Sequence, residues 1–166
     1  MDELNVVEAL DKATVKLAGS LDRSGAAAMV DLYYTWQEHR IALGNQTGQL
    51  VDAQSPAADV TRHFYGQVGA LEAQMAKALG AWANAQSVGQ WALSQVGIGP
   101  IMAAGLGAYV DITQAPTVGH IWAFAGLDPT AKWGKGQKRP WNARFKVHCW
   151  RIGDSFVKVS GKDTAY

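Results

Sequence analysis

Two long stretches of the chain carry apolar side chains at the spacing of an α-helix, and they limit the possible folds more than any other feature. Apolar positions step by 3, 4, 3 and 4 residues within 26–43, and by 4, 3, 4, 4 and 3 within 64–82. Such steps place side chains on one stripe of a helix. The stripes consist of Met29, Leu32, Trp36, His39 and Leu43, and of Phe64, Val68, Leu71, Met75, Leu79 and Trp82. The chain is therefore predicted to be mostly α-helical.

The two stretches are expected to pair as an antiparallel hairpin or coiled-coil arm within a helical region of residues 1–90. A helix over about 4–18 is predicted to precede them. Gly44 and Gly48 are predicted to end the second helix, and Pro56 suits the first turn of the third. Simple packing of both helices into a compact bundle is the alternative. A paired arm would also be a surface for forming homo-oligomers.

Composition excludes several classes of protein. In 166 residues, 48% are hydrophobic and 17% charged, which allows one real core. The mean hydropathy is -0.09, and no apolar run approaches the roughly 20 residues that cross a bilayer, so no membrane is expected as partner. The first residues lack the basic segment of a secretory signal. The single Cys149 excludes an intramolecular disulfide and a cysteine zinc cage, and these features favour the cytoplasm.

Charge is divided unevenly along the chain. Residues 1–131 hold six Lys and Arg against twelve Asp and Glu, for a net −6, whereas residues 132–166 hold nine against two, for a net +7. Such asymmetry bears on partners. It predicts that a polyanion binds the C-terminal end.

A glycine turn is predicted at Gly97-Ile98-Gly99, between an apolar helix end and Pro100 at the first position of a new helix. This order is typical of a helix-hairpin-helix motif, so residues 91–166 are expected to form a nucleic-acid-binding domain. Glycine lets backbone approach a ligand, and free amides at a helix N-terminus attract an anion. Ile98 is expected to lock the turn into the core, and the small residues from Ala103 to Gly107 to allow tight helix packing. A plain tight turn between helices is the alternative.

A basic segment follows. Thr117 is predicted to cap a short helix that ends at Gly126, and Asn142 to cap the last helix, with a basic loop between them. On the last helix, one stripe is expected to face the core: Phe145, Cys149, Ile152, Phe156 and Val159. The neighbouring stripe reads as cationic and carries Arg144, His148, Arg151, Ser155 and Lys158.

The basic segment is expected to hold phosphates and bases of DNA or RNA. The predicted phosphate contacts are Lys132, Lys135, Lys138, Arg139, Arg144 and Arg151, and Trp133 and Trp141 are the predicted stacking residues. An acidic surface of a partner, such as the −6 half of another copy, is the competing occupant, and the chain would then be an assembly protein.

Catalytic chemistry is not expected, and neither a metal nor a cofactor is predicted. The four histidines show no zinc-site spacing. His39, on an apolar stripe, is expected to be a core histidine, and Cys149 an inert buried thiol. Asp111, Asp128 and Asp154 could hold Mg²⁺, but turn and cap roles suit them better. A metal-dependent nuclease that uses Asp111 and Asp128 is the enzymatic alternative.

Over residues 60–160 the sequence resembles the C-terminal part of the DEDD-type insertion-sequence transposases related to the Piv/MooV invertases. The matching features are the long helix, the run Gly97 to Ala103, Asp111, and Phe124-Ala125-Gly126-Leu127-Asp128-Pro129 before a basic stretch. Transposase-like phage and prophage proteins are similar at Trp150 to Lys158. The resemblance implies nucleic-acid handling in DNA recombination and transposition, in the cytoplasm of a bacterial or phage-infected cell.

Two departures separate the chain from that family. The family's nuclease domain with its four metal-binding acids would precede the helical arm, and residues 1–60 do not supply it. The family's serine nucleophile would align at or near Gly134, and no serine lies between Ser94 and Ser155. DNA cutting is therefore not expected. The end at Tyr166, directly after a basic stretch, leaves open that the chain is a piece of a longer protein.

Overall fold

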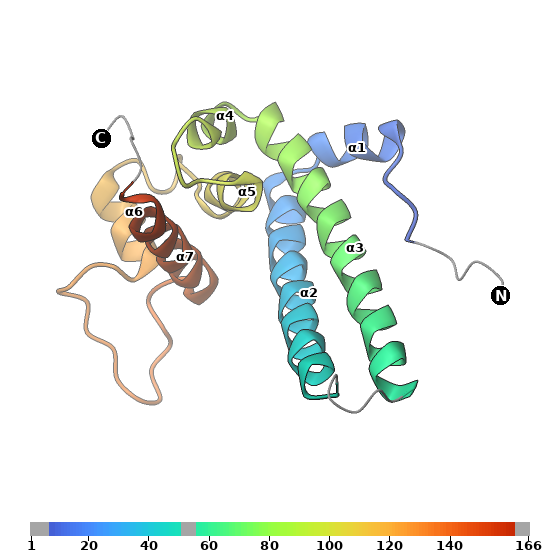
Figure 1. Ribbon diagram of the computed structural model, residues 1–166. Coiled ribbons are helices and arrows are strands. Elements are labelled where there is room, and N and C mark those ends of the chain that lie inside the picture. The colour runs from blue at the N-terminus through green and yellow to red at the C-terminus, as the bar shows by residue number, and fades with distance from the viewer. Residues whose placement is uncertain (1–6, 51–55, 162–166) are drawn as a thin grey trace.

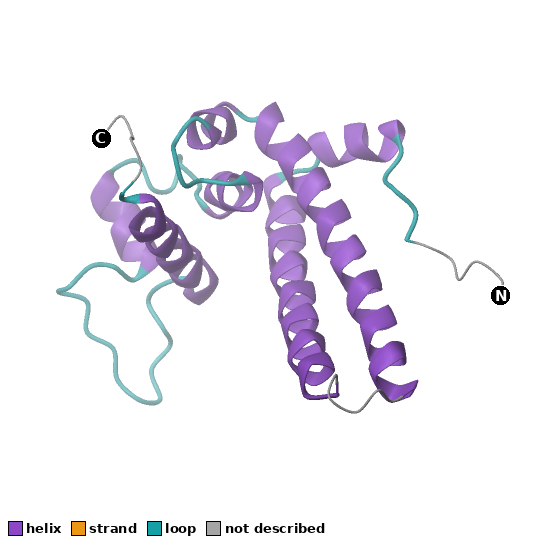
Figure 2. Ribbon diagram, in the orientation of Figure 1, coloured by secondary structure: helices purple, strands orange, loops and turns teal. Residues whose placement is uncertain are grey.

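The computed structural model describes residues 7–50 and 56–161, and these residues confirm the mostly helical prediction. Helices account for 72% of them, with no strand among them. The elements are α1 (Lys12–Gly19), α2 (Arg23–Leu50), α3 (Pro56–Ala85), α4 (Ser87–Leu93), α5 (Pro100–Tyr109), α6 (Val118–Ala125) and α7 (Ala143–Val159). Helices α2 and α3 lie side by side and extend from a body formed by the shorter helices (Figure 1, Figure 2).

Helix α1 is shorter than predicted. It begins at Lys12, where the Asp11 side chain accepts a hydrogen bond from the Thr14 amide, and residues 7–11 before it are not helical. The first part of the predicted helix, residues 4–6, lies outside the described residues. A capping carboxylate satisfies an amide at a helix N-terminus and so sets the starting residue.

Helix α2 continues through Gly44 and Gly48, so the predicted break there is wrong. A glycine inside a helix costs about 1 kcal/mol relative to alanine. At Gly44, however, a Cβ would lie only 3.0 Å from a ring carbon of Tyr65 on α3. The bare backbone therefore lets the tyrosine ring of α3 pack closely on α2, and this packing offsets the intrinsic cost.

The contact between α2 and α3 is polar in its middle. Buried Glu72 accepts hydrogen bonds from Arg40 Nε (2.5 Å), the Tyr33 hydroxyl (3.1 Å) and Gln37 Nε2 (3.3 Å). Burial raises the pKa of Glu72, but the hydrogen bonds, first that of Arg40, lower it overall, and the carboxylate stays ionised. This polar cluster aligns the two helices at one register.

The predicted apolar stripes accordingly do not form the seam between α2 and α3. Leu32 is 49% exposed and Phe64 55% exposed, and His39 is exposed, so its prediction as a core histidine is wrong. Met29 of the first stripe and Leu71 of the second instead line an apolar pocket of about 320 Å³ with α1, and the inner end of the second stripe lies in the core. Periodicity locates a stripe on a helix, but it does not identify the element that covers it.

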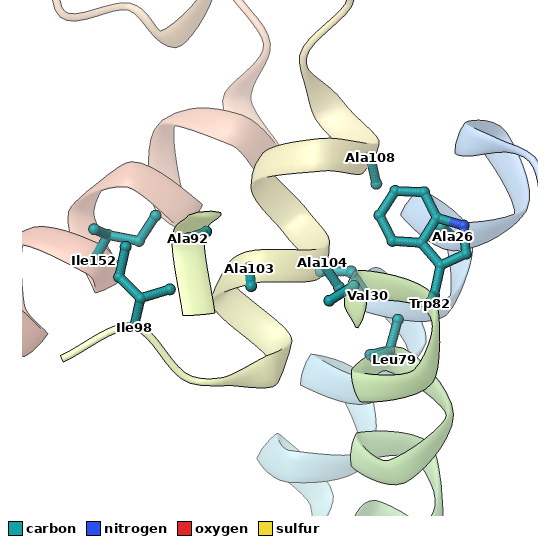
Figure 3. Close-up of a cluster of buried hydrophobic side chains, with 11 residues drawn as sticks. Ala26, Val30, Leu79, Trp82, Ala92, Ile98, Ala103, Ala104, Ala108 and Ile152 are labelled. Atoms are coloured by element: carbon teal, nitrogen blue, oxygen red, sulfur yellow. The ribbon is translucent and has the colours of Figure 1, made fainter. Parts of the chain in front are cut away.

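The core lies where α3 and α5 meet α2, α4 and α7 (Figure 3). Trp82 and Leu79 of α3 are fully buried, and the indole N–H of Trp82 donates to the Leu21 carbonyl (2.8 Å). The small residues of α5 are buried as expected: Ala103, Ala104, Gly105, Gly107 and Ala108. Because α5 has so little side-chain bulk, neighbouring helices approach its backbone closely.

Candidate nucleic-acid interface

The basic loop, residues 128–141, is closed at its base by α6 and α7. Thr117 caps α6, Gly126 ends it with a φ of 65°, and the Asn142 side chain caps α7, so all three predicted helix ends are confirmed. The Asn142 amide also donates to the Phe124 carbonyl (2.9 Å). Trp141 packs against Gly126 so closely that a Cβ there would lie 2.6 Å from the indole.

The loop presents its cations to solvent. Residues 131–140 are all exposed, and in the described part of the chain none of the loop's Lys and Arg side chains forms an ion pair. These cations are Lys132, Lys135, Lys138 and Arg139. The acid at the start of the loop, Asp128, accepts hydrogen bonds from the Thr130 amide (2.8 Å) and hydroxyl (2.7 Å), which is the predicted turn role.

Aromatic and cationic side chains of the loop stack on one another. The Arg139 guanidinium lies 5.3 Å from the Trp133 ring centroid, and Trp133 meets Trp141 edge to face at 6.0 Å. Lys146 of α7 lies 4.8 Å above the Trp141 ring. Cation–π contacts of this kind each contribute about 0.5–1 kcal/mol at exposed sites. The loop is thus fixed by its own side chains, Arg139 among them, while its three lysines form no ion pair within the described residues.

Arg144 and Arg151, two of the predicted phosphate contacts, are engaged within the protein. Arg144 forms an ion pair with Asp31 of α2, which also accepts a hydrogen bond from the Tyr109 hydroxyl (2.7 Å). The Arg151 guanidinium lies 3.4 Å from the centroid of the Tyr34 ring. Arg151 is thus used in packing against α2, whereas the Arg144 side chain stays 72% exposed beside Asp31.

His148, on the same stripe, is the most buried member. Its ring lies flat against α5, where a Cβ on Gly105 would come within 2.1 Å of Cε1, and its Nε2 lies 3.0 Å from the Met102 carbonyl. Nδ1 is buried and has no hydrogen-bond partner. Burial lowers the pKa of His148. Sequence reasoning assigned this position to the cationic face, because the closeness of a glycine on α5 gives no local signal.

The glycine turn is built as the residue types predicted. Gly97 has a φ of 93°, Ile98 is buried, and Gly99 caps α5 with Pro100 at its start. The turn rests on the C-terminal half of α7, where the Ser155 hydroxyl donates to the Gly97 carbonyl (2.6 Å). It borders a surface pocket of about 420 Å³ that is shared with Tyr34, Arg151 and Asp154, among others.

The turn and the loop lie at opposite ends of α7. Asn142, next to the loop, and Ser155, at the turn, are separated by about 20 Å at a rise of about 1.5 Å per residue. The structure therefore brings Trp133, Trp141 and the four loop cations together, but it places Gly97, Ile98 and Gly99 elsewhere. Two surface pockets beside α7 also carry acids that disfavour a polyanion, Asp154 in one and Asp31 and Glu38 in the other.

The candidate metal and nucleophilic residues have structural partners. Asp111 accepts from the Thr113 hydroxyl (2.6 Å) and pairs with Arg23 (2.5 Å), and these contacts, first that of Arg23, hold its pKa well below the ordinary range. Cys149 is half-buried rather than buried, and burial raises its thiol pKa. Among residues 7–50 and 56–161, no group of three metal-ligating side chains gathers. Within the same residues, no helix has the length and apolarity needed to cross a bilayer.

Comparisons with known proteins give no match. The chain fits no family model, and neither a curated protein nor a solved structure resembles it closely enough to count as a match. What the chain does is therefore inferred from its own residues.

Proposed function

We propose that the chain is a transposase-like nucleic-acid-binding protein that holds a phosphate backbone with its basic loop, in a context of DNA recombination. The observation that carries the proposal is the set of exposed, unpaired cations on a loop clamped at its base: Lys132, Lys135, Lys138 and Arg139. Lys146, beside Trp141, adds a fifth cation at the edge of the loop.

Two properties of the loop indicate that it binds a polyanion and is not simply a solvated surface. First, four cations fall within eight residues without an acid among them, so that their fields add. Second, the stem contacts and the stacking of Trp133 on Arg139 hold the loop in place before any ligand arrives. A preorganised site loses less conformational entropy on binding.

Binding by several phosphate contacts has a clear signature. The affinity for DNA is expected to fall with salt at a logarithmic slope of about −0.9 for each neutralised phosphate of a duplex. The double variant Lys135→Glu/Lys138→Glu should lose most of the affinity and flatten the salt dependence. Fluorescence anisotropy between 50 and 200 mM salt measures the affinity and its salt dependence. If wild type makes four phosphate contacts, its affinity should fall on the order of 10²-fold or more over this range.

The matched control is Lys12→Glu/Lys16→Glu, which reverses the charge of two exposed lysines on α1. This helix lies on the side of the molecule away from the basic loop (Figure 1). This variant should keep the slope and most of the affinity. Equal losses in the two double variants, or binding that does not respond to salt, would overturn the proposal.

A second candidate function is self-association through α2 and α3. The observation in its favour is the apolar face that continues outward from the pocket under α1 and leaves Leu32 and Phe64 half-exposed. Light scattering of nucleic-acid-free protein tests it: Leu32→Glu/Phe64→Glu should reduce the mass of any oligomer, whereas Lys135→Glu/Lys138→Glu should not. The reverse pattern would favour docking of the basic loop on an acidic neighbour.

A further inference from the structure

We infer that the basic loop and the outer face of α7 bind single-stranded nucleic acid in preference to duplex, with bases stacked on Trp133 and Trp150. This inference rests on the proposed function and names the form of its ligand. It follows from a row of cations and indoles formed by Arg139, Trp133, Trp141, Lys146 and Trp150.

The first part of the row is set within the loop. Trp133 is 44% exposed, and its indole N–H is already satisfied by the Gln137 carbonyl (2.8 Å). The hydrogen-bonding edge of the ring is therefore occupied inside the protein, and the exposed part that remains is apolar ring surface. Ring surface of this kind can pair with the flat face of a base.

The second part of the row runs along α7. Lys146 covers the Trp141 ring from the first turns of the helix, and Trp150 follows it by four residues, which places both side chains on the same face. Trp150 is 68% exposed, the largest exposed fraction of the seven tryptophans, all of which lie in the described part of the chain. The rise between the two positions is about 6 Å. An exposed indole thus stands one helical turn beyond a lysine that already touches the loop.

The combination of cations and exposed indoles selects the form of the nucleic acid. In a duplex, base faces are stacked on each other and only phosphates and groove edges are offered, so the indoles would contribute little. A single strand offers a phosphate and an open base face at every nucleotide. Cations between stacking platforms match that repeat, and stacking tolerates any base because each has a π-face.

The test compares a 20-nucleotide oligo(dT) strand with a 20-base-pair duplex at one salt concentration, by fluorescence anisotropy on the full chain. Wild type should bind the strand about tenfold or more tightly than the duplex, and Trp133→Ala and Trp150→Ala should each weaken strand binding about fivefold or more. Duplex binding should change less than about twofold in both variants, since phosphate contacts remain. Circular dichroism confirms that each variant is folded.

The matched control is Trp91→Ala, which removes a 60%-exposed indole on α4, away from the loop. It should leave both affinities unchanged. Preference for duplex, or strand binding that survives the loss of Trp133 and Trp150, overturns this inference but leaves the proposed function standing if the loop cations still govern affinity. Binding of neither form overturns both.

Discussion

The glycine turn and the basic loop differ in what the folded chain does with them, although sequence reasoning assigned both to phosphate. The turn rests on Ser155 and Phe156 of α7 and is half-buried, while the loop is exposed along residues 131–140. The cations near the two features follow the same division: Arg151 beside the turn lies on the Tyr34 ring, whereas Lys138 of the loop has no ion-pair partner in the described chain.

The comparison shows that the sign of a side chain's charge does not decide its role. A cation on a packed helix face is used by the nearest aromatic ring, as Arg151 is by Tyr34. A cation on a loop with no acid in reach keeps its charge available to a ligand.

The largest effect is expected where α7 docks on α5. Gly105→Ala would place a Cβ 2.1 Å from the His148 ring, so the ring and its helix must shift. Overpacking of this kind costs about 3 kcal/mol of unfolding free energy. Gly153→Ala, on the open side of α7, meets nothing within 4 Å and should stabilise the helix by about 0.5–1 kcal/mol. Urea denaturation measures the unfolding free energy of both variants. Similar unfolding free energies for the two would mean that α7 does not pack on α5 as described.

The next pair compares the turn and the loop directly. Gly97 and Gly136 both have positive φ, at 93° and 86°, but a Cβ on Gly97 meets Val159 at 3.0 Å while one on Gly136 meets open space. Gly97→Ala should therefore cost about 2 kcal/mol, from backbone strain and packing, and Gly136→Ala about 1 kcal/mol from strain alone. Thermal unfolding measures the difference. A larger loss of stability in Gly136→Ala than in Gly97→Ala would show that the loop, and not the turn, is the more tightly packed of the two.

The third prediction concerns pH. The folded-state pKa of His148 is lowered by burial, so the unfolded chain binds the extra proton first as pH falls. The stability that His148 contributes is complete above about pH 6.5, and it is lost below that value by up to about 1.4 kcal/mol per pH unit. His148→Gln should remove this loss of stability. The exposed His39, His63 and His120 are present in both proteins, so a difference between their pH slopes is due to position 148. Equal pH slopes for the two proteins would show that the imidazole is not held neutral.

The smallest effects separate structural from ligand-binding cations. Arg151→Gln should lower stability by about 1 kcal/mol, because it removes the stacking on Tyr34, and it should leave affinity for DNA nearly unchanged. Lys138→Gln should leave stability within about 0.5 kcal/mol and reduce the salt slope by about 1. Calorimetry together with a salt titration measures both properties. The opposite pattern would exchange the roles of the two cations.

Local features of the fold could be predicted from the sequence, because short-range chemistry sets them. The caps at Thr117 and Asn142, the αL end at Gly126 and the proline start of α5 each depend on residues within one turn. The turn roles of Asp111 and Asp128 are equally local, since each carboxylate is held by a threonine two residues on.

Long-range pairing could not be predicted in the same way. The partner of each apolar stripe depends on where α1 lies, and the burial of His148 depends on a glycine on another helix. Of the candidate site, the loop cations and both indoles were predictable, whereas the internal use of Arg144 and Arg151 was not. The exposure of Trp150 and the stacking of Lys146 on Trp141 were also missed, because the helical pattern of α7 does not indicate which face is left open. The family resemblance stays a prediction.

Because the basic loop is closed at its base, its sequence can be replaced without moving the helices on either side. Its two ends are tied by the Asn142–Phe124 hydrogen bond and by Trp141 against Gly126, so whatever lies between them starts and finishes at one place. Lengthening a segment of this kind changes its closure entropy only slowly, by roughly 0.6 kcal/mol for each doubling. The sequence between Pro129 and Pro140 can therefore vary in length and composition while the helices of the described residues are left as they are.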